Sequence, residues 1–159
     1  MGVTCLSPSG YLSGGLNSHY GSTACGGGYS PGYWKNHAWP AGIDRTKFRF
    51  TDAFPMPVGK QCLSSTGVQQ PASNTSYGCA LLDDVISRPS ASKSYDADRL
   101  GMHMAATYLN IRAGYVKFLT VEKLQEIWRE VTMNTVYQPT AGVTWSRAQL
   151  VAYLKATMQ

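Results

Sequence analysis

A short segment near the start of the chain gathers most of the side chains that could do chemistry. Residues 33–40 read YWKNHAWP, in which Tyr33 and Trp34 are followed by Lys35, His37 and Trp39. These five residues could form a ligand surface, for example for carbohydrate. They could instead form a structural clasp that fills a core, since each tryptophan can bury on the order of 200 Å², while Lys35 and His37 cap helix carbonyls or stack on the rings. Because a proline and a charged group are interleaved with the rings, we favour the clasp.

The rest of the sequence offers little catalytic chemistry. It contains no G-x-S-x-G elbow, no H-E-x-x-H and no P-loop glycine pattern. Glu122, Glu126 and Glu130 have helical spacing, which predicts a solvated face rather than two carboxylates across a cleft. We therefore predict no catalytic residues and no cofactor, and we favour a non-enzymatic role.

The histidines do not suggest a metal site. A zinc site needs three or four converging ligands, and no second histidine lies four residues from His19, His37 or His103. In a helix, His103 shares a face with Arg99 and Asn110. We expect that face to meet solvent or the edge of a groove, and we predict no metal ligands.

The four cysteines favour two disulfides. None of Cys5, Cys25, Cys62 and Cys79 forms a C-x-x-C pair, and all lie in loop-rich sequence. Pairing Cys5 with Cys25 and Cys62 with Cys79 closes the shortest loops, and we favour it over the other two connectivities and over four reduced thiols. Disulfides indicate an oxidising compartment, so we expect an extracellular or cell-surface protein.

The N-terminus and the charge bear on export and partners. The opening residues have no basic n-region and no apolar h-region, and no apolar run approaches the roughly 20 residues of a membrane span. Either a signal or anchor segment has been removed, which is the simpler interpretation, or export uses another route. Only 14% of the residues are charged and the net charge is +5, which permits contact with anionic surfaces without requiring nucleic acid. Arg45, Lys47 and Arg49 could share one face of an extended segment that contacts DNA, but a solvated face explains them as well.

The chain divides by composition into three stretches of one predicted domain, residues 1–159. Residues 1–34 contain no Asp, Glu, Lys or Arg and are rich in glycine, serine and tyrosine. We interpret them as an arm of irregular loops, with or without a short hairpin, that a disulfide holds in place. The alternative is a flexible linker. Residues 35–78 hold the clasp and loops, and residues 79–159 are predicted to form a small helical bundle. The expected fold class is mainly α.

Hydrophobic periodicity predicts four helices, over residues 79–87, 96–114, 120–134 and 144–158. Pro89 should stop the first helix. Asp96 and Asp98 suit the positive end of the second, and Trp128 lies on the inner stripe of the third. Ser146 begins a capping box for the fourth, whose first turn contains Gln149.

Two features of the middle stretch are less regular. Residues 46–50 read TKFRF, which predicts either a short strand or an extended segment that lays Phe48 and Phe50 on the core. Asn74 begins an N-x-S tripeptide, a weak acceptor pattern for glycosylation.

Residues 32–40, GYWKNHAWP, resemble the G-[YF]-W-K-x-H…W-P signature of a family of uncharacterised bacterial secreted and cell-surface domains. In that family the motif precedes a helix with a leucine-rich turn and then a helix similar to LGMHMAATYLNIRAG. CALLDDVISRP (residues 79–89) and that second helix (residues 100–114) follow here in the same order. The resemblance covers about residues 32–114, with a shorter gap between His37 and Trp39. It implies an exported bacterial surface protein and assigns no catalytic residues.

Together these features predict a non-catalytic structural or adhesive subunit of a bacterial surface assembly, such as a pilus, filament or envelope component. Its expected partners are other copies of the chain or other surface-protein subunits. The alternative is an extracellular domain that binds or hydrolyses carbohydrate or another ligand through Trp34 and Trp39.

Overall fold

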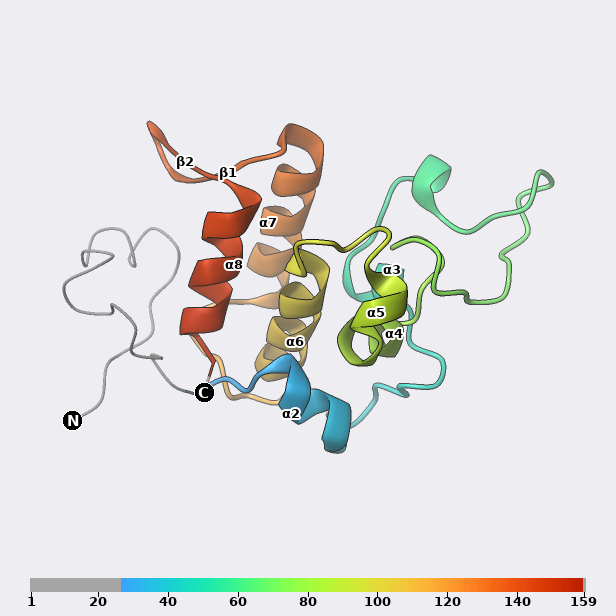
Figure 1. The fold of residues 1–159 in the computed structure, drawn as a ribbon, viewed down its shortest axis with the longest axis horizontal. Helices are drawn as coiled ribbons and strands as arrows, with labels where there is room; N and C mark the ends of the chain where they lie inside the picture. The colour runs from blue at the N-terminus through green and yellow to red at the C-terminus, as the bar shows by residue number, and fades with distance from the viewer. Residues whose placement is uncertain (1–26, 159) are drawn as a thin grey trace.

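The computed structural model describes residues 27–158 of the chain as a mainly helical domain (Figure 1). Within them lie seven α-helices and one two-stranded antiparallel hairpin. The predicted pairing of Cys5 with Cys25, and the proposed hairpin of the arm, fall outside these residues. The predicted mainly α class is confirmed for the part that the structure describes.

The elements follow one another in the order α2 (Pro31–Asn36), α3 (Phe50–Ala53), the 3-10 helix η1 (Val58–Lys60), α4 (Leu82–Ser87), α5 (Pro89–Ser92), α6 (Leu100–Arg112), α7 (Val121–Asn134), β1 (Tyr137–Thr140), β2 (Val143–Trp145) and α8 (Arg147–Ala156).

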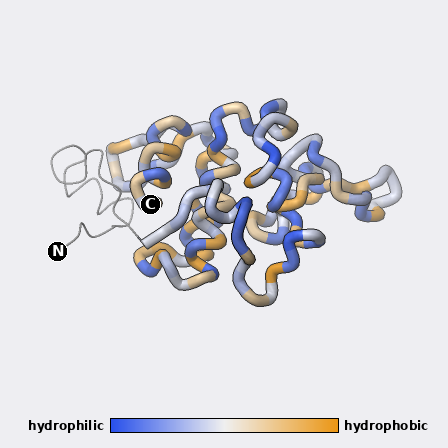
Figure 2. Tube along the Cα trace, turned by 60° about the horizontal axis from the view of Figure 1, so that its bottom comes forward, coloured by the Kyte–Doolittle hydropathy of each residue, from blue (hydrophilic) through white to orange (hydrophobic). Residues whose placement is uncertain are grey.

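Helix α6 is the centre of the domain. It contacts α2, α3, α4, α7 and α8, and nearly all of its residues are buried. A helix that is covered on every side needs no polar face, which explains its run of small and apolar residues. Hydrophobic and hydrophilic residues are interspersed along the part of the chain that the structure describes (Figure 2).

The ends of the long helices follow from local sequence. Thr120 caps α7 by accepting a hydrogen bond from the Lys123 N–H, and Ser146 forms the predicted capping box with Gln149. Helix α6 begins four residues later than expected from residue 96, because Arg99 has a left-handed backbone with φ of 62°. Asp96 still serves this helix end.

The Asp96 carboxylate accepts hydrogen bonds from the N–H groups of Gly101 (2.7 Å) and Met102 (3.0 Å), although it is buried. Asp98 accepts from the N–H of Leu100 at 3.1 Å. These carboxylates satisfy the free donors at the positive end of α6. The predicted function of the two aspartates is thus confirmed.

The prediction that Pro89 stops the first helix is confirmed, since α4 ends at Ser87 with Arg88 as its C-cap. Pro89 also begins α5, where a proline needs no N–H. The expected position of His103 on α6 was wrong. His103 does not face solvent, since only 5% of it is exposed. Helix α8 packs against α6, and the charge of Lys155 on that helix acts on His103. A single-helix pattern could not reveal this second covering helix.

The aromatic part of the core joins distant segments. The ring of Trp128 on α7 lies 5.1 Å from that of Phe50, 5.6 Å from that of Phe54 and 4.9 Å from that of Tyr77, measured between centroids. Phe50 is fully buried and Phe48 packs at the edge of the core. Residues 46–50 are thus neither a strand nor extended throughout: a turn that ends at Lys47 leads to one antiparallel bridge from Arg49 to Leu81, and Phe50 begins α3. The expectation that both phenylalanines lie on the core is confirmed.

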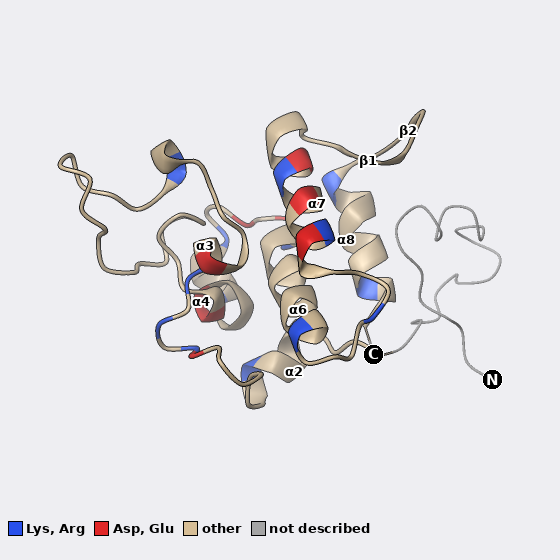
Figure 3. Cartoon of the chain, turned by 180° about the vertical axis from the view of Figure 1, so that it is seen from behind, with Lys and Arg blue, Asp and Glu red and all other residues tan. Residues whose placement is uncertain are grey.

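The loop between η1 and α4 projects from the helices (Figure 1). The Cys62–Cys79 disulfide closes its base across a sequence separation of 17, and so confirms this predicted pair. The loop carries no charge, whereas α7 carries charges of both signs along its outer side (Figure 3). The Asn74 amide nitrogen, to which a glycan would attach, is buried, and the folded chain therefore does not offer it for glycosylation.

The hairpin of β1 and β2 was not predicted; periodicity assigned residues 144–145 to the last helix. Tyr137 pairs with Trp145 across the two strands, and both side chains are buried. Within residues 27–158, none of the helices has the length and the apolar composition that a membrane crossing requires.

Replacing Trp128 by alanine should reduce the free energy of unfolding by about 3–5 kcal/mol, because it leaves a large cavity in the aromatic core. Glu126→Ala is the control. Its exposed ion pair with Lys123 contributes at most about 0.5 kcal/mol. Chemical denaturation of both variants checks this, and equal effects would show that α7 packs through another face.

Burial lowers the pKa of His103. Below about pH 6.5 the His103 side chain is protonated in the unfolded chain, whereas in the folded chain it is protonated only at lower pH. The free energy of unfolding should therefore be unaffected by His103 above this pH, and it should decrease as the pH falls towards the lowered pKa of His103 in the folded chain. In His103→Gln the loss between neutral and mildly acidic pH should be smaller. Parallel pH dependences of the two unfolding free energies would contradict the assignment.

Candidate functional site

Trp34, the first tryptophan of the predicted cluster, is a core residue. Only 2% of it is exposed. It stands on α2, which begins with Ser30 as N-cap and Pro31 in its first turn. Its indole N–H donates a 3.0 Å hydrogen bond to the side-chain oxygen of Asn110 on α6. The ring faces therefore contact protein rather than solvent.

Asn110 also holds the chain that leads into α2. Its side-chain oxygen accepts from the Tyr29 N–H and its side-chain nitrogen donates to the Tyr29 carbonyl, each at 2.9 Å. The amide thus pairs with one backbone residue as a neighbouring strand would. Together with the Trp34 bond, the buried Asn110 amide thus makes three hydrogen bonds, two to the Tyr29 backbone and one to the Trp34 indole.

Gly28 fits where no larger residue could. Its N–H donates to the Thr157 carbonyl at 3.2 Å, and it forms a parallel bridge with Met158. A Cβ on Gly28 would lie 2.6 Å from the Thr157 oxygen and 2.9 Å from the Asn110 side-chain nitrogen. The segment is therefore wedged between the end of α6 and the last residues of the described chain. Figure 1 shows the C-terminus beside the start of the coloured ribbon.

Arg45 closes the other end of α2. Its guanidinium donates to the carbonyl oxygens at the helix C-terminus, those of Trp34 (3.4 Å), Lys35 (3.1 Å) and His37 (3.1 Å). It also forms a 2.8 Å ion pair with Asp83 of α4. These bonds satisfy carbonyls that a short helix leaves free and connect α2 to α4. The proposed DNA-contacting face therefore loses Arg45 to an internal contact.

Trp39 is half-buried beside this arginine. The Arg45 guanidinium lies 4.7 Å from the centre of the Trp39 ring, and the Trp39 indole N–H donates to the Trp34 carbonyl at 2.9 Å. One side of the ring is thus occupied by a cation. Trp39 braces the end of α2, as the clasp interpretation expects.

Tyr33 and His37 form a stack on the exposed side of α2. Tyr33 lies 4.0 Å from the Tyr29 ring and 3.8 Å from the His37 ring, both nearly parallel. His37 Nδ1 lies 2.7 Å from the Tyr33 carbonyl oxygen, which can only accept, so Nδ1 carries the proton. Lys35 is exposed on the same helix. Of the predicted residues, Tyr33 and His37 are the ones that offer aromatic rings at the surface.

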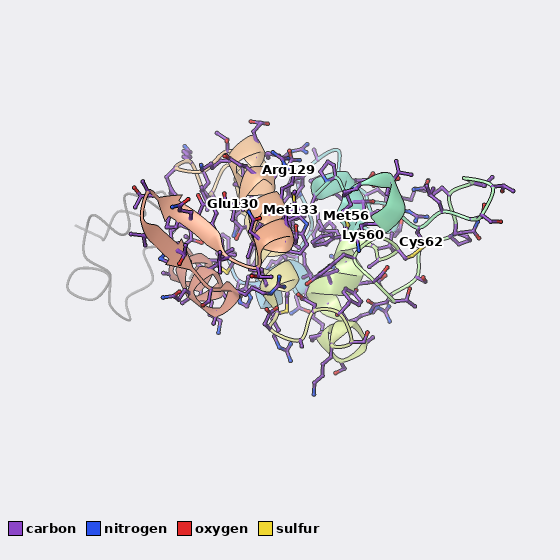
Figure 4. All side chains as sticks on the ribbon, turned by 90° about the horizontal axis from the view of Figure 1, so that it is seen from above. Met56, Lys60, Cys62, Arg129, Glu130 and Met133 are labelled. Atoms are coloured by element: carbon purple, nitrogen blue, oxygen red, sulfur yellow. A yellow bond between two sulfur atoms is a disulfide. The ribbon has the colours of Figure 1, made fainter. Side chains whose placement is uncertain are left out.

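A separate pocket of about 590 Å³ opens between the segment after α3 and helix α7. In Figure 4, Met56 and Lys60 lie opposite Arg129 and Met133. The pocket is lined by apolar and aromatic residues and by two cations, among them Met56, Lys60, Tyr77, Tyr95, Trp128 and Arg129. The pocket could not be predicted from the sequence, because its walls come from segments far apart in the chain.

Sequence reasoning also missed Asn110 and Arg45. Asn110 had one available signal: it is an amide within a helix of otherwise small or apolar residues, and a buried amide needs partners. Arg45 had none, because the helix end that it caps is recognised only when the chain folds back. Within residues 27–158, no three His, Cys, Asp or Glu side chains gather closely enough to hold a metal ion.

Comparison of the chain with protein-family models, with curated proteins and with solved structures gave no match.

Asn110→Ala should lower the free energy of unfolding by about 2–4 kcal/mol, because it strands the Trp34 indole N–H and the Tyr29 backbone groups inside the fold. Asn36→Ala is the matched control. That amide is exposed and bonds only to the Gly32 carbonyl of its own helix. Denaturant unfolding measures both, and a loss below about 0.5 kcal/mol for Asn110→Ala would contradict the anchoring role.

Proposed function

We propose that the chain is a non-catalytic structural or adhesive domain of an extracellular bacterial surface assembly, in which the helical body anchors the uncharged N-terminal arm. The carrying observation is the pairing of the Asn110 amide with both backbone groups of Tyr29. This pairing fixes the position and direction in which the chain enters the body. The motif residues thus support order rather than a reaction.

The composition of the arm fits this role. Residues 1–34 carry no charged side chain, so burying them against a neighbouring subunit would not desolvate charges, which is costly. Tyr29 and Tyr33 present a stacked aromatic surface next to the anchor. Tyrosine suits interfaces because one end of it is apolar and the other is polar.

The compartment rests on the disulfide and on the resemblance. The Cys62–Cys79 bridge is consistent with an oxidising compartment. The similarity of residues 32–40 to the motif of exported bacterial domains supports the cell surface as the location.

The alternative, a domain that binds or hydrolyses a ligand through Trp34 and Trp39, has less support. Trp34 is buried, and Arg45 stacks on the Trp39 ring. A sugar-binding platform needs open ring faces, and the Tyr33 ring beside them is itself stacked between Tyr29 and His37.

The test uses the full chain. Sedimentation velocity over a wide concentration range, with electron microscopy, should show self-association of the wild type. Trp34→Ala should lose that association and should be cleaved faster by protease between residues 27 and 33, while circular dichroism still shows the helices. Lys35→Ala, an exposed change on the same helix, should behave as the wild type.

A wild-type chain that stays monomeric at every concentration would contradict self-assembly. Equal protease resistance of Trp34→Ala and the wild type would contradict the anchor itself. The two results separate the assembly proposal from its structural basis.

A further inference from the structure

The pocket between η1 and α7 has no part in the anchor. It is built from the segment around η1, from the residues before Cys79 and from α7. Its wall is tightly fitted: a Cβ on Gly78 would lie 2.0 Å from the Lys60 carbonyl oxygen. The neighbouring disulfide ties the chain after Lys60 to the residue after Gly78. The pocket is thus a defined part of the fold, held by a covalent bond.

The interior of the pocket presents aromatic surface. The Tyr77 hydroxyl donates to the buried Asp96 carboxylate, and the Tyr95 hydroxyl donates to the Asn74 side-chain oxygen. Burial raises the pKa of both phenols, so both stay neutral. With their hydroxyls engaged elsewhere, the two tyrosines offer ring surface to an occupant, whereas Trp128 lines the pocket but is only 2% exposed.

Two cations border this aromatic surface. Lys60 and Arg129 are exposed pocket residues, and neither side chain has a hydrogen-bond or ion-pair partner among residues 27–158. No acidic residue lines the pocket. The nearby carboxylate of Glu130 on α7 accepts instead from the Gln138 N–H at 2.9 Å.

We propose that this pocket binds a small molecule that has an aromatic or apolar body and one anionic group, with the body against Tyr77 and Tyr95 and the anion between Lys60 and Arg129. The volume of about 590 Å³ is in the range of small-molecule sites, which are mostly apolar with a few polar groups that orient the ligand. Met133, on the same rim, is 79% exposed. A ligand would cover this large apolar side chain.

The lining favours this class of ligand over two others. A sugar needs many hydrogen-bonding partners, and here the polar side chains are few. The arm of a second copy carries no acidic group, so it would leave both cations without a partner. An anion with an apolar body uses both parts of the pocket.

The test measures binding of 2-naphthoate, indole-3-acetate and dodecanoate to the full chain by calorimetry, with 2-naphthalenemethanol as the uncharged match for naphthoate. At least one of the anions should bind with a Kd below about 1 mM, and naphthoate should bind tighter than the alcohol. Failure of all three anions to bind at that level would overturn the proposal. Equal affinities of naphthoate and the alcohol would also overturn it.

Variants locate the site. Lys60→Gln and Arg129→Gln should each weaken the anion about fivefold, as expected for partly exposed charge pairs, and should leave the alcohol unchanged. Thr132→Phe, an exposed change on the pocket wall, should weaken both probes. Lys117→Gln removes an exposed charge that is not part of the pocket and is the control. If Lys117→Gln weakens naphthoate as much as Lys60→Gln does, the attraction is general and the proposed site is wrong.

Discussion

The structure depends on one buried amide. Asn110 lies in the central helix with no exposed surface, and an amide in that position destabilises the fold unless its oxygen and nitrogen find partners. It finds them in the backbone of Tyr29 and the indole of Trp34. The N-terminal segment therefore supplies the hydrogen bonds that the buried Asn110 amide needs, and these bonds in turn hold that segment in place. Neither part is complete without the other.

This dependence explains why the motif has its composition. Trp34 supplies apolar surface and one donor for Asn110. Gly28 supplies the closest approach of backbone to the end of α6, where a side chain would clash. Arg45 fixes the far end of α2 to α4. The segment with the lysine, histidine and tryptophans thus joins elements that are distant in sequence.

The sequence predicted what depends on neighbouring residues. The capping box at Ser146, the inner position of Trp128 and the Cys62–Cys79 pair all follow from spacing along the chain. What it could not predict depends on where distant segments meet. His103 was assigned to the surface because the pattern of its own helix cannot show that other elements, α8 among them, pack around α6. The pocket at Lys60 and Arg129 is likewise invisible until the chain folds, because its cations are 69 positions apart. The burial of Trp34 was predicted, but its hydrogen-bond partner Asn110 was not.

Hydrogen exchange at two sites tests the central claim most directly. In the full chain, NMR should show that the Tyr29 backbone N–H and the Trp34 indole N–H exchange as slowly as the core amides of α6. Both should open only with that helix, because both donate to the buried Asn110 oxygen. Fast exchange of these two protons while the α6 amides remain protected would show that the segment opens independently, and it would contradict the account.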